Sequence, residues 1–213
     1  MYAMFDPATL AAAERHLARN CAVMKKLIRK HGPCTLAERR RDPFATLCSA
    51  IISQQLSTKA ADTIQKRVVA LCGVRGKLTP AGLLAVTPEA LRGCGLSNAK
   101  AKWLQALAGK TASGELNFRK LLKMDDEAAI ETLDALPGIG RWTAEMYLMF
   151  AMGRVDLFSL GDVGLRRGVD IHFNQGRKLD EVATLAIVER WTPYRTVACW
   201  YLWRSQDGPA DAG

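Results

Sequence analysis

The chain has 213 residues, of which 49% are hydrophobic and 24% are charged. This length allows one domain or two small ones, and a composition so rich in apolar residues excludes a disordered chain. Lysine and arginine number 30 against 21 aspartates and glutamates, so the formal net charge at pH 7 is +9. A basic chain of this size indicates a polyanionic partner, most often a nucleic acid, although an unrelated basic enzyme also fits the charge alone.

No segment of the sequence predicts a membrane anchor or an export signal. No apolar run approaches the roughly 20 residues that a spanning helix needs, and the N-terminus lacks a charged start followed by an apolar stretch. We therefore expect a cytoplasmic protein working at the bacterial nucleoid, or a nuclear one if the source is eukaryotic. The 6 cysteines form no C-x-x-C pair and the histidines are scattered, which predicts reduced, buried thiols and no zinc or iron–sulfur site.

The predicted elements are helices throughout. Asp6-Pro7 and Asp42-Pro43 are each typical of an N-cap followed by proline in the first turn. After the first signal, apolar residues recur at helical spacing up to Gly32, which predicts a helix that ends there. Four later helices are predicted with both ends: Ser57 to Cys72, Ser97 to about Ala112, Asp125 to Ala135 and Arg141 to Met152. For five more the sequence predicts only the start, at Thr79 and Thr87 and near Asp162, Asp180 and Pro193. Because no segment alternates apolar and polar residues as a strand does, the predicted fold class is all-α.

The most informative segment is residues 133–145, Leu-Asp-Ala-Leu-Pro-Gly-Ile-Gly-Arg-Trp-Thr-Ala-Glu, in which a predicted turn at residues 136–140 joins two helices. Gly138 and Gly140 let the backbone approach a ligand closely, and backbone N–H groups that open a helix suit an anionic phosphate. Arg141 and Thr143 can add a positive charge and a hydroxyl donor. Such contacts hold DNA without reading its sequence. A hairpin that only packs two helices is the alternative, and the net charge favours phosphate binding.

This segment resembles the helix-hairpin-helix of the base excision DNA glycosylases that form the HhH-GPD superfamily. Asp162 follows Trp142 by 20 residues, and its surroundings, Leu160-Gly161-Asp162-Val163-Gly164, resemble the catalytic segment of that family. The resemblance covers about residues 40–204 and is strongest to the AlkA-type 3-methyladenine DNA glycosylases II. It implies an enzyme that flips alkylated bases out of damaged double-stranded DNA, excises them and leaves an abasic site.

Asp162 is the candidate catalytic residue. Cleavage of an N-glycosidic bond builds positive charge on the sugar, and a carboxylate beside the sugar stabilises that charge and can orient water. An aspartate that opens a helix is by itself more often an N-cap. The hairpin and the spacing favour the catalytic role, and both roles can hold together.

The residue at position 142 separates two mechanisms. Relatives that also cleave the strand resemble this hairpin but carry a lysine there, whose amine attacks the sugar. An indole cannot attack, so Trp142 predicts a monofunctional enzyme with no associated lyase. The indole also suits cationic, electron-poor bases such as 3-methyladenine through stacking and cation–π contact. A core aromatic residue is the alternative for Trp142 taken alone.

The resemblance assigns further roles around the flipped base. It implies that Trp203 walls the base pocket, and that Met146 stands where AlkA-type proteins tend to carry an aromatic residue, so the range of bases stays open. Gln55, with Gln54 as second candidate, matches the residue that intercalates into the gap left by the base. A polar turn at a helix junction is the alternative for these two glutamines.

The resemblance implies no required cofactor. The backbone carbonyls of Asp134, Leu136 and Ile139 match positions that hold a monovalent cation in the hairpins of the family. The iron–sulfur cluster of endonuclease III-like relatives is not expected, because only Cys199 follows Cys94. Nor do we expect the N-terminal β-domain of the longer AlkA-type proteins.

The expected organisation is two helical subdomains with a cleft between them. One contains residues 1–42 and 155–213, and the other contains residues 43–154 with the hairpin at about 125–153. We expect a monomer that binds double-stranded DNA and no membrane. Three other interpretations stay open: a glycosylase for uracil, mismatched thymine or deaminated purines, a non-catalytic DNA-binding module, and a basic helical protein without DNA binding.

Overall fold

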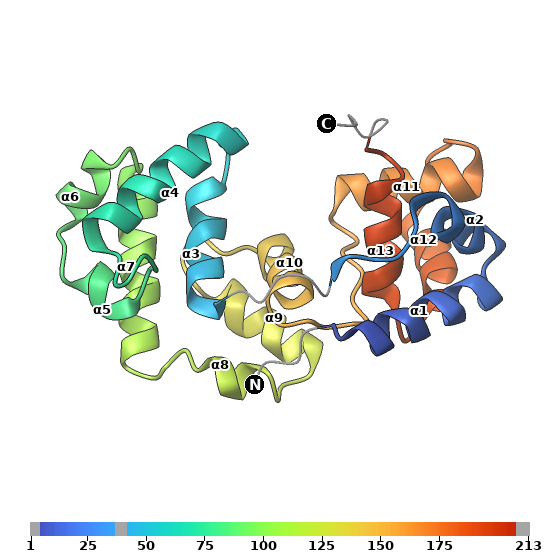
Figure 1. The fold of residues 1–213 in the computed structure, drawn as a ribbon, viewed down its shortest axis with the longest axis horizontal. Coiled ribbons are helices and arrows are strands. Elements are labelled where there is room, and N and C mark those ends of the chain that lie inside the picture. The colour runs from blue at the N-terminus through green and yellow to red at the C-terminus, as the bar shows by residue number, and fades with distance from the viewer. Residues whose placement is uncertain (1–4, 37–41, 208–213) are drawn as a thin grey trace. The chain divides into compact units, whose positions relative to one another are not determined.

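The structure is a computed structural model and describes residues 5–36 and 42–207 (Figure 1). Within these two ranges the chain forms helices and turns, with an isolated bridge between Val74 and Lys77 and no strand. The predicted all-α fold is therefore confirmed. None of the helices in this part of the chain is long and apolar enough to cross a bilayer.

The chain divides into two compact units. The first contains Met1–Arg40 and Leu148–Gly213, and the second contains Arg41–Tyr147. The sequence-based boundaries lie after residues 42 and 154. We call the two parts the terminal unit and the central unit.

In the terminal unit, α13 packs against α1, α2 and α11. Tyr201 of α13 is fully buried, and its hydroxyl lies 2.8 Å from Glu14 Oε1 and 2.9 Å from the Gly32 carbonyl oxygen. These contacts connect α13 to α1 and to the end of α2. The helices of this unit are α1 (Pro7–Asn20), α2 (Ala22–His31), α11 (Val163–Asn174), α12 (Glu181–Val188), the 3₁₀ turn η2 (Glu189–Trp191) and α13 (Arg195–Arg204).

The prediction of a single helix up to Gly32 is wrong, because the chain leaves helical geometry at Cys21 (φ −146°, ψ 112°). The Cys21 N–H donates to the Leu17 carbonyl at 3.0 Å, and the Cys21 carbonyl accepts from the Lys25 N–H at 2.9 Å. One residue thus closes α1 and opens α2. Cys21 is itself buried, so apolar side chains keep their helical spacing across the break and conceal it.

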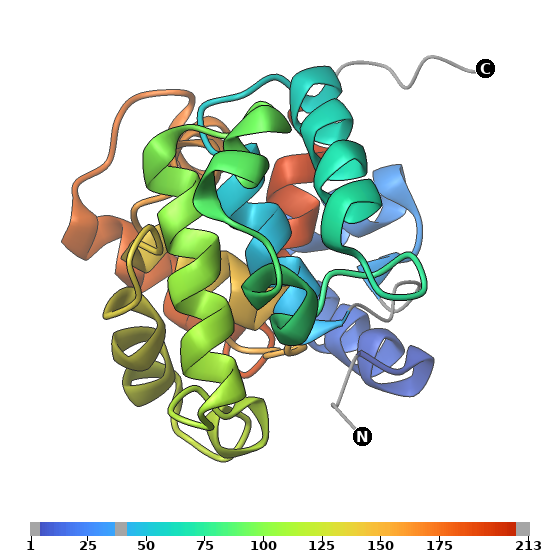
Figure 2. The same cartoon turned by 90° about the vertical axis from the view of Figure 1, so that its left-hand side faces the viewer.

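In the central unit, α7 packs against α3, α5 and α6 (Figure 2). The capping residues that predicted these helices are confirmed: Asp42, Ser57 and Ser97 each accept a hydrogen bond from a backbone N–H three residues later. The helices are α3 (Pro43–Ser53), α4 (Thr58–Cys72), α5 (Pro80–Leu84), α6 (Pro88–Gly93), α7 (Asn98–Ala112), α8 (Phe118–Leu121), α9 (Asp126–Asp134) and α10 (Arg141–Phe150), whose last residues belong to the terminal unit.

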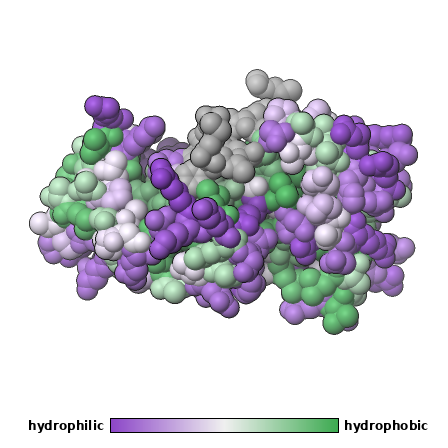
Figure 3. Space-filling view, turned by 90° about the horizontal axis from the view of Figure 1, so that it is seen from below, coloured by the Kyte–Doolittle hydropathy of each residue, from purple (hydrophilic) through white to green (hydrophobic). Residues whose placement is uncertain are grey.

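The surface mixes polar and apolar side chains, and hydrophilic residues cover most of the face drawn in Figure 3. Among the described residues, three large apolar side chains are more than half exposed: Val163 at 80%, Val182 at 78% and Trp142 at 51%. Trp142 is the one among these that the sequence singled out. Its exposure excludes the interpretation of Trp142 as a core aromatic residue.

Candidate active site and DNA-contacting hairpin

Asp162 is the N-cap of α11 and is buried, with 8% of its surface exposed. Its Oδ1 accepts two hydrogen bonds, from the Leu165 N–H at 2.7 Å and from Trp203 Nε1–H at 3.1 Å. The N-terminus of α11 also stabilises a negative charge at this position. The carboxylate is therefore fixed in orientation by a backbone donor three residues away in sequence and by a side-chain donor 41 residues away.

Trp203 lies near the end of α13 and packs against Phe150, with ring centroids 5.6 Å apart. Gly164 permits the close approach of this indole to Asp162. A Cβ at position 164 would lie 3.2 Å from Asp162 Oδ1 and 3.3 Å from Trp203 Cδ1. Sequence reasoning assigned no role to Gly164, although it stands within the Gly-Asp-Val-Gly segment that singled out Asp162.

Trp203 also lines a cavity of about 300 Å³ within the terminal unit. Trp200 and His31 contribute to the same wall. Burial lowers the pKa of His31, and the charges of Lys30 and Arg204 lower it further. The cavity thus places the Trp200 indole and the His31 imidazole beside Trp203, the side chain that holds Asp162.

The hairpin consists of α9, a turn and α10. Gly138 has a φ of +82°, and a Cβ there would lie 2.4 Å from Trp103 Cε3. Glycine is needed at this position for both reasons, because L-residues avoid this φ and the indole leaves no room. At Gly140, by contrast, an added Cβ would meet no atom within 4 Å.

The side chains of Arg141 and Thr143, which the sequence predicts to contact DNA, are paired or buried within the protein. Arg141 forms a paired hydrogen bond with Glu127, at 2.6 and 2.8 Å, and its Nε donates to Glu145 Oε1 at 3.0 Å. The carboxylate of Glu127 raises the pKa of Arg141. Thr143 is buried, with 9% of its surface exposed. The backbone of the turn is thus better placed for a phosphate than these two side chains.

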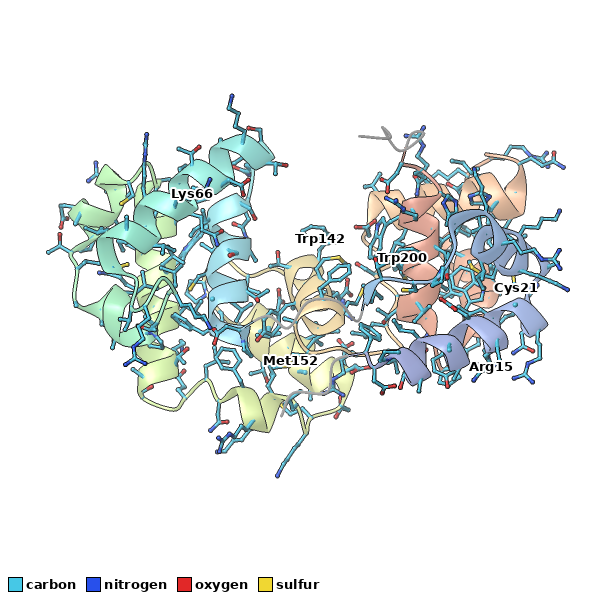
Figure 4. The ribbon with its side chains drawn as sticks, viewed as in Figure 1. Arg15, Cys21, Lys66, Trp142, Met152 and Trp200 are labelled. Atoms are coloured by element: carbon cyan, nitrogen blue, oxygen red, sulfur yellow. The ribbon has the colours of Figure 1, made fainter. Side chains whose placement is uncertain are left out.

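On α10, Trp142 projects from the surface, where Figure 4 labels it. Met146 is half-buried one turn later. Trp142 and Met146 belong to the central unit, whereas Asp162 and Trp203 belong to the terminal unit. In the central unit, Trp142 and Met146 thus lie on the same helix. In the terminal unit, Asp162 and Trp203 are in direct contact through a hydrogen bond.

The two glutamines between α3 and α4 have different surroundings. Gln54 is half-buried, and its Nε2 donates to the Gly138 carbonyl at 2.6 Å. Gln55 is exposed and has a φ of +57°. A left-handed conformation at a residue other than glycine is uncommon and marks strained or functional positions. Of the two, Gln55 is the one whose side chain is available to a ligand.

Lys100 of α7 is a residue of this region that the sequence did not reveal. Its Nζ donates to the Ile52 carbonyl at 2.8 Å and to the Gln54 carbonyl at 2.6 Å. Burial lowers the pKa of Lys100. A lysine on a helix offers no sequence signal for such a contact, since its partners are backbone atoms 46 and 48 residues away.

The carbonyls proposed for a cation lie at the end of α9 and in the turn. Asp134 is the last residue of α9, and the Leu136 carbonyl already accepts from the Ile139 N–H at 3.0 Å. A carbonyl oxygen has a second lone pair, and oxygen ligands suit hard cations. Among the described side chains, no group of three or more His, Cys, Asp or Glu could hold a metal ion.

The exposed surface of α2 is strongly basic. Lys25, Lys26, Arg29 and Lys30 are exposed, and α2 contains no acidic residue. Residues three and four positions apart are neighbours on the surface of a helix. We call these four residues the basic face of α2.

Comparison with known proteins gives consistent results. The sequence profile of the HhH-GPD superfamily base excision DNA repair proteins matches residues 48–193. The Schizosaccharomyces pombe alkylbase DNA glycosidase-like protein mag2 is 30% identical over 195 residues, which cover 90% of this chain and 92% of that protein. The crystal structure of a DNA-3-methyladenine glycosidase from Bacillus halodurans superposes with a TM-score of 0.81 at 39% identity, covering 89% of this chain and 86% of that one. The 3-methyladenine DNA glycosylase of S. pombe in complex with abasic DNA superposes with a TM-score of 0.73 at 31% identity, covering 91% and 96%.

Proposed function

Because the chain belongs to the HhH-GPD superfamily of base excision DNA repair proteins, we propose that it is a DNA glycosylase for alkylated bases of the 3-methyladenine class. The product is DNA with an abasic site. The observation that carries this proposal is the carboxylate of Asp162, buried and held by the Leu165 N–H and by Trp203 Nε1. The relatives named for 3-methyladenine support the choice of base.

The proposed reaction uses the carboxylate electrostatically. As the bond between C1′ and the base nitrogen breaks, its electron pair leaves with the base and the sugar becomes positive. Asp162 stabilises that charge, and its two N–H donors keep it in place without reorganisation during the reaction. A water molecule then adds its oxygen to C1′ and releases a proton. An N3-alkylated adenine is already cationic and departs neutral, so the reaction needs no general acid.

The activity proposed is monofunctional. Trp142 offers an indole where strand-cleaving relatives carry an amine, so no Schiff base with the sugar forms at that position. Its half-exposed ring is instead a stacking surface for an electron-poor base. The expected readout is base release without strand cleavage until alkali is added.

Two features support the proposed binding to double-stranded DNA, which we propose the chain performs as a monomer. In the turn, the N–H groups of Gly138 and Gly140 are the ones we assign to a phosphate, because those of Ala135, Leu136 and Ile139 donate to carbonyls of the hairpin itself. A monovalent cation held by the carbonyls of Asp134, Leu136 and Ile139 would add positive charge there. The basic face of α2 adds sequence-independent attraction to the phosphates.

The test is release of free base from methylated duplex DNA by the wild type and by Asp162→Asn. We expect wild type to release 3-methyladenine, and the variant to be at least about 100-fold slower because it loses a charge preorganised for the transition state. DNA affinity should stay within about threefold, since Asp162 contributes no cation to phosphate binding. If both proteins bind DNA and neither releases methyladenine, a panel with uracil, mismatched thymine and deaminated purines decides between another lesion and a binding module.

A further inference from the structure

Two loops of the central unit rest on the same side of α7. Lys100 holds the end of α3 through the carbonyls of Ile52 and Gln54. Trp103 lies directly under Gly138 of the hairpin turn, where a Cβ would come within 2.4 Å of the indole. Residues three apart in a helix lie on one face. A single turn of α7 therefore supports both the loop that carries Gln55 and the turn of the hairpin.

A direct bond joins the two supported loops. Gln54 Nε2 donates to the Gly138 carbonyl at 2.6 Å, across 84 residues of sequence. The loop of residues 54–57, the hairpin turn and α7 thus form a closed set of three mutual contacts. Movement of one loop alone would break at least one of these bonds.

Lys100 binds carbonyls that α3 itself leaves without a partner. The last carbonyls of a helix have no N–H partner within it, and a positive charge near them is favourable. The ammonium group takes two of these carbonyls at the end of α3, just before Gln55 enters its left-handed conformation. Burial of the ammonium opposes this arrangement, so the two short bonds are needed to maintain it.

We propose that Lys100 is a positioning residue that holds Gln55 ready to fill the gap left in the duplex when a base leaves the stack. This inference rests on the proposed function. It assigns Lys100 to the extrusion of the base and leaves bond cleavage to Asp162. The effect of losing Lys100 should therefore depend on how firmly the damaged base is stacked and paired.

The experiment compares Lys100→Met with Lys102→Met, a matched change of an exposed lysine on the same helix. Single-turnover base release is measured on two duplexes, with methyladenine opposite thymine and opposite an abasic residue. For Lys100→Met we expect about a tenfold loss on the paired substrate, as for a hydrogen bond from a charged group, and less than about twofold on the unpaired one. Lys102→Met should stay within about twofold on both, as a surface substitution.

An equal loss on both duplexes would mean a general structural effect and would overturn the inference. Amide exchange at residues 55–57 without DNA provides a readout that does not depend on activity. It should be at least about tenfold faster in Lys100→Met than in wild type and unchanged in Lys102→Met. Unchanged exchange in Lys100→Met overturns the inference, whereas absence of base release by wild type counts against the proposed glycosylase instead.

If Lys100→Met does not fold, Gln54→Ala tests the same contact set from the other side. This variant removes the bond to Gly138 and leaves Lys100 in place. It should show the same dependence on the base opposite the lesion with a smaller loss. Equal loss on the two duplexes would again contradict the proposal.

Discussion

The Asp162 site and the hairpin turn differ in the part of the chain that is proposed to contact DNA, which is a side chain in the first and the backbone in the second. In the proposed reaction the carboxylate of Asp162 acts on the sugar, and the Trp203 indole and one backbone N–H hold it. At the hairpin the proposed contact is made by the backbone, because the side chains of Arg141 and Thr143 are paired or buried. The two regions should therefore respond to different kinds of substitution. Loss of a side-chain hydrogen bond should reduce the reaction rate at Asp162, whereas a side chain added at Gly138 should disturb the backbone of the hairpin turn.

The largest effect expected from the hairpin is that of Gly138→Ala. The new Cβ would meet Trp103 at 2.4 Å in a backbone conformation with φ of +82°. Overpacking and the disfavoured φ together should lower the free energy of unfolding by about 3 kcal/mol. DNA affinity should fall with it, because the turn must shift. Denaturant unfolding and binding isotherms measure the two effects.

Gly140→Ala is the matched control for that prediction. No atom lies within 4 Å of the added Cβ at position 140, so the change should alter stability by less than about 1 kcal/mol. A loss of DNA affinity at unchanged stability would mean that Gly140 itself approaches the phosphate. Equal destabilisation by the two variants would contradict the role given to Trp103.

At Asp162, the proposed catalytic carboxylate, we expect a smaller loss from Trp203→Phe. The substitution keeps an aromatic ring and removes the Nε1–H donor to Asp162. A hydrogen bond to a charged group contributes about 2 kcal/mol, so the single-turnover rate should fall about 30-fold. Trp200→Phe is the control, because Trp200 lines the same cavity on the same helix and its ring packs against Tyr201. If both variants lose rate equally, the aromatic cavity and not the hydrogen bond explains the loss.

These contrasts also explain what the sequence could and could not predict. Helix starts such as Asp42, Ser57 and Ser97 are local signals, because each cap bonds a backbone N–H three residues away. The hairpin is equally local. Other contacts join residues that are far apart in sequence. Trp203 and Asp162 are 41 residues apart, and Lys100 and Ile52 are 48 residues apart. The identity of these residues alone does not predict such contacts. The role of Trp203 came from resemblance, and no sequence pattern pointed to Lys100.

Neutralising the basic face of α2 should change DNA binding without changing the chemical step. In a variant with all four residues replaced by glutamine, the salt dependence of log K should become less steep by about 0.9 for each phosphate that the helix no longer binds. The single-turnover rate at saturating protein should be unchanged, because these residues lie on α2 and not at the carboxylate. Isotherms at several salt concentrations measure the slope.

The control removes the same number of charges elsewhere, at Lys102, Lys123, Arg177 and Lys178, all of which are exposed. If both quadruple variants reduce the slope equally, net charge alone accounts for the effect. A slope that falls only in the α2 variant locates phosphate contacts on that helix.

The smallest effect is expected where a side chain of the hairpin is already paired. Arg141 is held by the exposed Glu127 and by the buried Glu145. Because the guanidinium is already paired, Arg141→Ala should weaken DNA binding less than about threefold, the size expected for an exposed charge such as that of the pair with Glu127. Glu127→Gln releases part of the guanidinium and also removes a charge that repels DNA, so it should tighten binding slightly. The two contributions separate in a double-mutant cycle. If Glu127→Gln tightens binding equally in the wild type and in the Arg141→Ala background, only repulsion is at work. A gain that requires Arg141 would show that this side chain exchanges its carboxylate partner for a phosphate, and that the hairpin uses side chains as well as backbone.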